Sequence, residues 1–255
     1  MLLTPQQVPT REKLILTGLY LSKYDSLGLK KLGFESFVEA FNVIGYALGE
    51  KPASIKNYRD EFDPLFPNAR KGWHKRPTRQ YCLKVFEEYK GLDLETFTAL
   101  VKSFAGFDEN AWSEVETKPK KGDSESSFAK RLVTGLAAEH YFESVRATVA
   151  EFKGCSLENT TRLGCGYDFR LCPTTENGDF LAVEVKGLTD RTGSLSLTPK
   201  EYEVASALTS RFFLFVVKNF RESPFHEIYQ NPLATRLKFA KKERVTVHVS
   251  WLTTV

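Results

Sequence analysis

Two neighbouring segments of the chain carry acidic and basic side chains at a spacing that could serve chemistry on a phosphate. Asp168 lies on a first predicted β-strand, and a second predicted strand carries Glu184 and Lys186 among apolar residues. Because side chains alternate between faces along a strand, Glu184 and Lys186 share one face and Val185 points to the other. Two carboxylates and a lysine at the edge of a small sheet can bind a divalent cation and a water molecule beside a phosphate.

The Glu-x-Lys pattern alone is weak evidence, because it recurs at 88–90, 116–118, 151–153 and 184–186. Only the last copy lies inside an apolar strand that ends in a glycine, Gly187, and follows a strand with an aspartate. The alternative interpretation of Glu184 and Lys186 is an ion pair on a solvated strand face.

These two strands are predicted to form a hairpin, since Asn177-Gly178 between them is a strong turn signal. On the second strand one face should carry Phe180 and Ala182 with the charged pair. The opposite face should enter the core through Leu181, Val183 and Val185.

A long helix should precede the hairpin, from a cap at Ser124 or Ser126 to about Ala150. Its predicted buried stripe is formed by Phe128, Leu132, Leu136 and Phe142. Glu139 lies within about 20° of that stripe, where a carboxylate costs energy unless it has a partner. Glu139 therefore forms an ion pair, lies at a partly wet edge of the stripe, or points toward a metal site.

After the hairpin, Thr198-Pro199-Lys200-Glu201 is typical of a helix start with a capping box. Capping is a sufficient role for Glu201, so we do not predict that it is catalytic. Residues 212–217 read as a buried strand, and 244–251 as a last strand. This order of elements predicts an α/β sandwich with a central mixed sheet.

Composition is that of a globular protein, with 255 residues, 42% hydrophobic and 27% charged residues and a formal charge of +4. That charge permits a nucleic-acid partner without demonstrating one. No apolar run approaches the ~18 residues of a membrane span, and the N-terminus does not resemble a signal peptide. The cysteines lack zinc-site spacing, so we expect reduced thiols in a cytoplasmic protein at Cys82, Cys155, Cys165 and Cys172.

The chain is predicted to divide into two units. Residues 1–110 show several short helical patterns, which predict a small all-α domain. Residues 111–124 are polar and poor in apolar side chains, as in a linker, and 125–255 form the α/β unit.

The helical unit contains a basic segment with aromatic residues, 70–79, that has no acidic residue. Such a segment can contact phosphates and stack or wedge at a base. The candidate DNA-binding residues are Arg70, Lys71, Trp73, His74, Lys75, Arg76 and Arg79. The alternative is a solvated basic loop with Trp73 packed in the helical core.

The second unit resembles the PD-(D/E)xK nuclease superfamily, and most of all the family of the Protein NO VEIN C-terminal domain. The resemblance spans about residues 125–220 and rests on the order of its motifs. These are Gly135-x-x-x-Glu139, Gly166-Tyr167-Asp168, Val183-Glu184-Val185-Lys186-Gly187, Leu197-Thr198-x-x-Glu201-Tyr202-x-x-Ala205 and the strand 213–217. One departure is Gly-Tyr-Asp in place of Pro-Asp.

By position, the resemblance implies a metal-dependent phosphodiesterase. Asp168, Glu184 and the Val185 carbonyl would bind Mg²⁺, for which Mn²⁺ should substitute, and Glu139 would bind through water or serve a second metal. Lys186 would orient or help to deprotonate the attacking water. These oxygen ligands suit a hard cation.

We therefore expect a cytoplasmic, Mg²⁺-dependent DNA endonuclease whose helical unit binds or selects DNA. A restriction or anti-phage role follows only from association with the family. Cutting both strands calls for two sites, so a homodimer is expected. The alternatives are a DNA- or partner-binding protein that keeps the fold without cleavage, and a nuclease for branched DNA or RNA.

Overall fold

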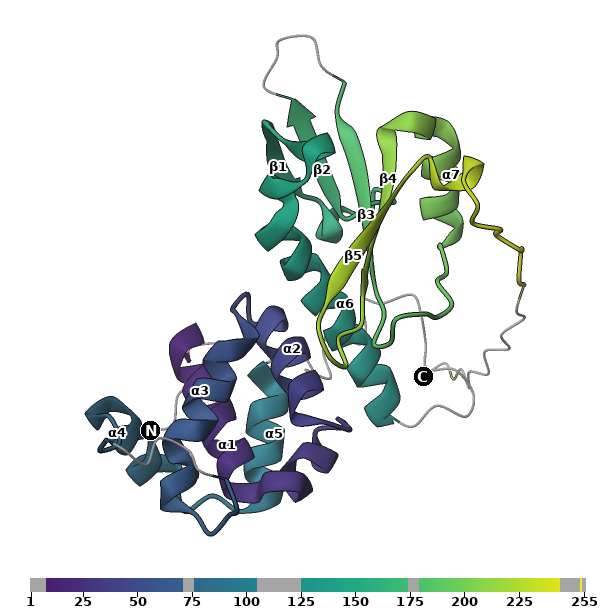
Figure 1. Cartoon of the computed structure of the whole chain (residues 1–255). Coiled ribbons are helices and arrows are strands. Elements are labelled where there is room, and N and C mark those ends of the chain that lie inside the picture. The colour runs from purple at the N-terminus through teal and green to yellow at the C-terminus, as the bar shows by residue number, and fades with distance from the viewer. Residues whose placement is uncertain (1–7, 71–75, 105–124, 174–178, 244–252, 254–255) are drawn as a thin grey trace.

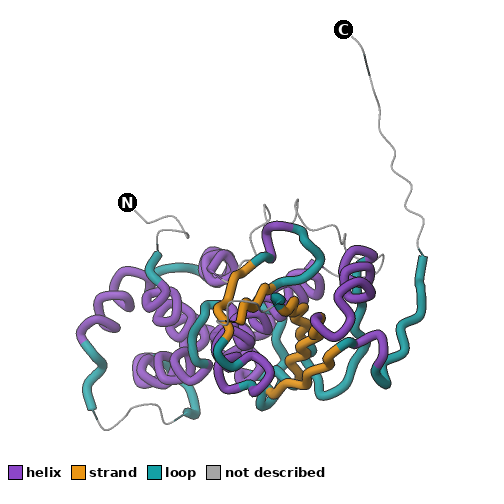
Figure 2. The backbone as a smooth tube through the Cα atoms, turned by 90° about the horizontal axis from the view of Figure 1, so that it is seen from above, coloured by secondary structure: helices purple, strands orange, loops and turns teal. Residues whose placement is uncertain are grey.

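The computed structural model describes residues 8–70, 76–104, 125–173, 179–243 and 253, and the side chains from 130 onward in the long helix that opens the second unit. In this part of the chain a helical unit lies beside a five-stranded sheet (Figure 1). Seen from above in Figure 2, the helical unit stands to one side of the strands. The predicted α/β class with a mixed sheet and preceding helices is confirmed.

Two helices of the helical unit, those that begin at Phe37 and Leu94, start with a side-chain cap. Ser36 accepts a hydrogen bond from the Glu39 amide at 3.1 Å, and Asp93 accepts one from the Thr96 amide at 2.9 Å. The helices are α1 (Thr10–Lys31), α2 (Phe37–Ala47), α3 (Pro52–Phe62), α4 (Gln80–Tyr89) and α5 (Leu94–Phe104). None of the helices in the described ranges is long and apolar enough to cross a membrane.

The sheet has its strands in sequence order, β1 to β5. Neighbours are antiparallel except β3 and β4, which are parallel and joined through α7 (Pro199–Leu208). The strands are β1 (Cys155–Asn159), β2 (Phe169–Pro173), β3 (Leu181–Gly187), β4 (Phe212–Lys218) and β5 (Phe225–Gln230).

Two helices cover opposite faces of this sheet. On one face α6 (Glu125–Val145) packs through Phe142, whose ring lies 4.9 Å from that of Phe169 and 5.0 Å from that of Phe215. On the other face α7 forms a smaller cluster, in which Ala205 packs with Ala182. The predicted alternation along β3 is confirmed, because its core-facing residues join the first cluster and Ala182 joins the second.

Some predicted elements differ from the structure. The strands β1 and β5 were missed, because both are edge strands with largely wet side chains and no continuous apolar run. Helix α6 ends at Val145 rather than near 150, where short 3₁₀ turns follow. The predicted turn at 177–178, linker at 111–124 and strand at 244–251 lie outside the described residues.

The helical unit is joined to the sheet unit by a helix contact with polar links. Helix α2 packs on α6, and hydrophobic residues of both units form one continuous core. The Asn42 amide donates to the carbonyls of Phe220 at 2.8 Å and Glu222 at 3.0 Å. Lys130 of α6 pairs with Glu39 of α2 at 2.6 Å.

Gly187 ends β3 where the strand presses on α6. A Cβ atom there would lie 2.7 Å from the Thr134 carbonyl oxygen. We expect Gly187→Ala to lower the free energy of unfolding in urea by about 2 kcal/mol or more, because backbone cannot yield as a flexible side chain does. Gly135→Ala is the control: its Cβ would meet nothing within 4 Å in the middle of α6, so stability should stay equal or rise. Equal stability of both variants would contradict this.

Candidate functional site

The candidate site lies where β2 and β3 separate, and Asp168 marks that point. Pairing of the two strands ends at Phe169 and Val183, just after Asp168 in the chain. The Asp168 carboxylate then takes the place of a backbone acceptor, since its Oδ2 accepts a hydrogen bond from the Val185 amide at 2.8 Å. This bond fixes the carboxylate against β3, beside the residues on either side of Val185.

Glu184 and Lys186 project from β3 toward the face covered by α7. Glu184 is only 3% exposed, and its Oε1 accepts from the Lys186 Nζ at 2.5 Å. The same ammonium donates to Oε2 of Glu201 on α7 at 3.0 Å. Lys186 is thus held between two carboxylates. The solvated ion pair considered from the sequence is wrong in one respect, because Glu184 is buried.

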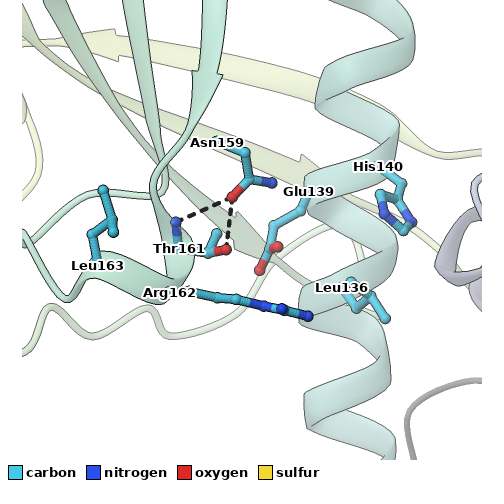
Figure 3. A pocket seen from close by; sticks show the side chains of 7 residues that line it. All are labelled: Leu136, Glu139, His140, Asn159, Thr161, Arg162 and Leu163. Atoms are coloured by element: carbon cyan, nitrogen blue, oxygen red, sulfur yellow. Dashed lines mark hydrogen bonds between the residues drawn. The ribbon is translucent and has the colours of Figure 1, made fainter.

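Glu139 approaches from α6 and lines a cavity of about 470 Å³. Figure 3 shows its carboxylate pointing from the helix toward the turn that holds Thr161 and Arg162. No ion pair of Glu139 occurs among the described residues, which leaves the two other interpretations, a wet edge and a metal site. Repulsion from Asp168 is the second cause, after burial, that raises the pKa of Glu139.

The carboxylates raise one another's proton affinity. Burial is the larger cause and repulsion from Asp168 the second cause that raise the pKa of Glu139 to about 8. The same two causes, in the same order, raise the pKa of Glu184 well above its ordinary value. Burial raises the pKa of Asp168 to about 6, although its bond from Val185 opposes the rise. For Lys186, burial would lower the pKa, but Glu184 and Glu201 outweigh it and raise the pKa.

The order of these features is helix carboxylate, strand aspartate, Glu-x-Lys strand, capped helix and buried strand. Residues 136–230 match the family Protein NO VEIN, C-terminal. The match runs from within α6 to the end of β5, so the resemblance predicted for the second unit is confirmed there. Membership of the PD-(D/E)xK superfamily stays a prediction. No curated protein and no solved structure matches the chain.

The segment that matches this family contains donors suited to a hard cation. Glu184 and Glu201 bind the Lys186 ammonium, and burial makes the charged forms of Asp168, Glu184 and Glu139 unfavourable. A divalent cation would stabilise these charged forms through oxygen ligands. Asp168 and Glu184 would hold it, with Glu139 at a second position.

These carboxylates do not form a compact ligand cluster in the described part of the chain. Across the described ranges, no three His, Cys, Asp or Glu side chains are grouped as they would be around a metal ion. One reason is visible, because Lys186 occupies Oε1 of Glu184. Val185, predicted to ligate through its carbonyl, lies at the same point, because its backbone N–H donates a hydrogen bond to the Asp168 carboxylate.

Glu201 has a second role that its position in a capping box did not indicate. The capping box is confirmed, since the Thr198 amide donates to Glu201 Oε2 at 2.9 Å and the Glu201 amide donates to Thr198 Oγ1 at 3.2 Å. The same carboxylate also binds Lys186. Glu201 therefore caps α7 and also binds Lys186, and the second role follows only from the packing of α7 on β3.

The described residues of the basic segment do not lie at the candidate site. Helix α4, which follows the segment, packs on α1 at the end of the helical unit away from the sheet in Figure 1. Lys71, Trp73, His74 and Lys75 lie outside the described residues.

The described arginines of that segment bind internal carboxylates. Arg70 donates to both oxygens of buried Asp63, at 2.9 and 2.8 Å. Arg76 donates to both oxygens of buried Glu61, at 2.9 and 2.5 Å, and the Arg79 amide donates to Glu61 at 2.8 Å. The segment itself contains no acidic residue, but α3 and the turn after it supply acidic partners for its arginines.

Because the arginines pair with internal carboxylates, the lysines of the segment are the residues to replace in a test of DNA binding. Lys71→Gln with Lys75→Gln should weaken duplex binding and lower the log–log salt slope by about 0.9 for each phosphate that is no longer bound. Arg76→Gln should instead lower the urea midpoint, because it removes the arginine that binds both oxygens of buried Glu61 and leaves only the weaker partner Arg79. Unchanged duplex affinity of the lysine variant at low salt would assign the helical unit to dimerisation or to a protein partner.

Proposed function

We propose that this protein is a divalent-metal-dependent endonuclease that hydrolyses phosphodiester bonds in DNA. The observation that carries the proposal is the bond from the Val185 amide to Asp168, which fixes this acid beside buried Glu184 and next to Lys186. Burial and repulsion from Asp168 raise the pKa of both Glu139 and Glu184, and burial raises that of Asp168, so each of these carboxyl groups has an energetic cost and no evident value for stability. Such a cost is typical of a functional site.

Each side chain has a role that its surroundings support. Asp168 and Glu184 would hold Mg²⁺ or Mn²⁺, and the cation would supply charge neutralisation at the phosphate and a more acidic water. Lys186 keeps its proton because two carboxylates surround it, so it acts as a hydrogen-bond donor and a positive charge rather than as a base. It can orient the attacking water and stabilise negative charge on the phosphate.

Replacing Lys186 tests this role. Lys186→Ala should lower the single-turnover cleavage rate by about a hundredfold or more, while duplex affinity changes little, because one lysine among many adds little to binding. Glu201→Gln keeps a capping side chain but weakens the hold on Lys186, so a smaller fall in rate is expected. Glu203→Gln, an exposed change on the same helix, is the control. A large fall in affinity with an unchanged rate would make Lys186 a phosphate contact only.

The proposal also covers the helical unit, the number of copies and the cell compartment. The helical unit would bind or select DNA, two copies would together cut both strands, and the cell compartment would be the cytoplasm. Restriction or anti-phage defence is the setting that the family resemblance suggests.

The decisive experiment incubates the purified full chain with plasmid, modified phage DNA, branched DNA and RNA, in Mg²⁺, Mn²⁺ or EDTA. Cleavage of DNA with either metal and none in EDTA is the expected result. Binding of DNA without cleavage of any substrate would favour a non-catalytic DNA-binding protein. Cleavage of branched DNA or RNA alone would move the substrate to that class.

A further inference from the structure

The cavity beside Glu139 has a second wall made by the turn between β1 and β2. That turn is a 3₁₀ segment, Thr161–Leu163, and it faces α6 across a space of about 470 Å³, a volume typical of ligand pockets. Arg162 extends from it across the cavity toward Leu136 (Figure 3). Leu163 completes the rim.

Arg162 differs from the other arginines that the structure describes. Each of the others makes a hydrogen bond, an ion pair or a ring contact, as at Arg70, Arg76, Arg146, Arg170, Arg211 and Arg221. Arg162 makes none with the described residues, and it is exposed. A guanidinium offers five donors in a planar fork, which is the geometry that binds phosphate.

Leu163, the next residue, is also unusual. It is 68% exposed and is the most exposed of the large hydrophobic side chains in the described ranges. A leucine held in water at the rim of a polar cavity gains free energy when a partner covers it. Leucine side chains are among those that proteins press against bases and sugars of nucleic acids.

The turn that carries both residues is rigid. Asn159 Oδ1 accepts from the Thr161 amide at 3.1 Å and from its hydroxyl at 2.7 Å (Figure 3), which locks the first residue of the turn. Gly164 ends it in the left-handed region at φ 57°.

The same turn is bonded to the candidate metal ligand. Buried Thr160 donates from its amide to the Asp168 carbonyl at 2.8 Å and from its hydroxyl to the Tyr167 carbonyl at 3.0 Å. Arg162 and Leu163 therefore keep a fixed position relative to Asp168.

We propose that this cavity is a subsite for the nucleic-acid strand next to the bond that is cut. Arg162 binds the phosphate that flanks the scissile one, and Leu163 packs against the neighbouring sugar or base. The ligand class is a phosphodiester strand, since the Arg162 guanidinium, the Thr161 hydroxyl and the exposed Leu163 side chain match its phosphate, sugar and base. This subsite rests on the proposed function, because that function places a phosphodiester at Asp168.

Binding without cleavage is the primary test. Fluorescence anisotropy in EDTA measures the affinity of the full chain for a labelled DNA duplex, its single strand and the matching RNA duplex over a salt series. Arg162→Gln should weaken binding roughly tenfold and lower the log–log salt slope by about 0.9. Leu163→Ser should weaken binding about fivefold without changing the slope, because no counterion is released at an apolar contact. The probe whose affinity falls most identifies the strand type.

Two control variants match these changes in chemistry. Lys153→Gln removes an exposed cation before β1, at the end of that strand opposite the turn, and Leu27→Ser removes an exposed leucine of α1. Both should bind like the wild type. Wild-type affinity and slope for Arg162→Gln would overturn the subsite, as would a wild-type chain that binds none of the probes at low salt.

Cleavage assays separate the two proposals. If the wild type cuts DNA with metal and Arg162→Gln binds and cuts equally well, the subsite is wrong and the proposed function stands. If nothing is cut with any metal but Arg162→Gln still binds more weakly and with a smaller slope, the subsite stands and hydrolysis is wrong.

Discussion

Asp168→Asn and Glu184→Gln are each expected to lower the single-turnover rate of DNA cleavage by on the order of 10³. If a cation binds at these carboxylates as proposed, losing one of the charges would remove several kcal/mol of stabilisation from the transition state, and each ~1.4 kcal/mol is a factor of ten in rate. Both changes keep the size of the side chain, which matters at Glu184 because it is 3% exposed. Duplex affinity in EDTA should stay within about twofold.

A matched variant on α7 and two folding measurements serve as controls for this result. Glu203→Gln alters an exposed carboxylate of α7 and should cut like the wild type. Circular dichroism and urea unfolding establish that both site variants fold. Wild-type cleavage by either Asp168→Asn or Glu184→Gln would refute the assignment of that residue to the metal site.

Asp168→Asn should also make the metal-free protein more stable at pH 8, although it removes a native charge. Burial raises the pKa of this carboxyl from 3.8 to about 6, so the folded state keeps a proton that the unfolded state loses between these two pH values. Stability contributed by the group is therefore full below pH 3.8, falls up to about pH 6 and stays low above it. At ~1.4 kcal/mol per tenfold change in proton affinity, the loss is about 3 kcal/mol.

Urea unfolding in EDTA at pH 3.5, 5 and 8 measures this effect. The difference between variant and wild type should grow from near zero at pH 3.5 to its full value at pH 8. Comparing the two proteins cancels other carboxylates of opposite sign, such as Glu61, whose pKa is lowered by Arg76 and Arg79 against the effect of burial. Adding Mg²⁺ at pH 8 should stabilise the wild type more than the variant. A constant difference at all three pH values would contradict the buried-charge explanation.

Local patterns predicted the parts of the site that depend on neighbouring residues in the chain. Alternation along β3 placed Glu184 and Lys186 on one face, and the capping box at Thr198 defined the start of α7. Contacts between distant segments could not be predicted in this way. The bonds of Lys186 to Glu201 and of Arg70 to Asp63 arise only when helices pack, and edge strand β1 has too few apolar residues to be recognised.

The role of Arg162 lay beyond sequence reasoning for a related reason. An arginine in a loop is ordinary, and its distinction is that every other described arginine is engaged while it is not. That comparison needs the whole set of contacts. The bond from Thr160 to Asp168, which brings the turn to the site, likewise joins residues whose side chains carry no recognisable motif.

The contact of α2 with the sheet unit limits how far the helical unit of this protein can be replaced by a foreign one. Asn42 binds backbone carbonyls of the loop after β4, and Arg221 in that loop pairs with both Glu35 and Asp190. A chimera that grafts a foreign helical unit onto residues 125–255 would leave these groups and the α2 face of α6 without their partners. A functional transplant of the helical unit would therefore have to carry α2 and α6 together.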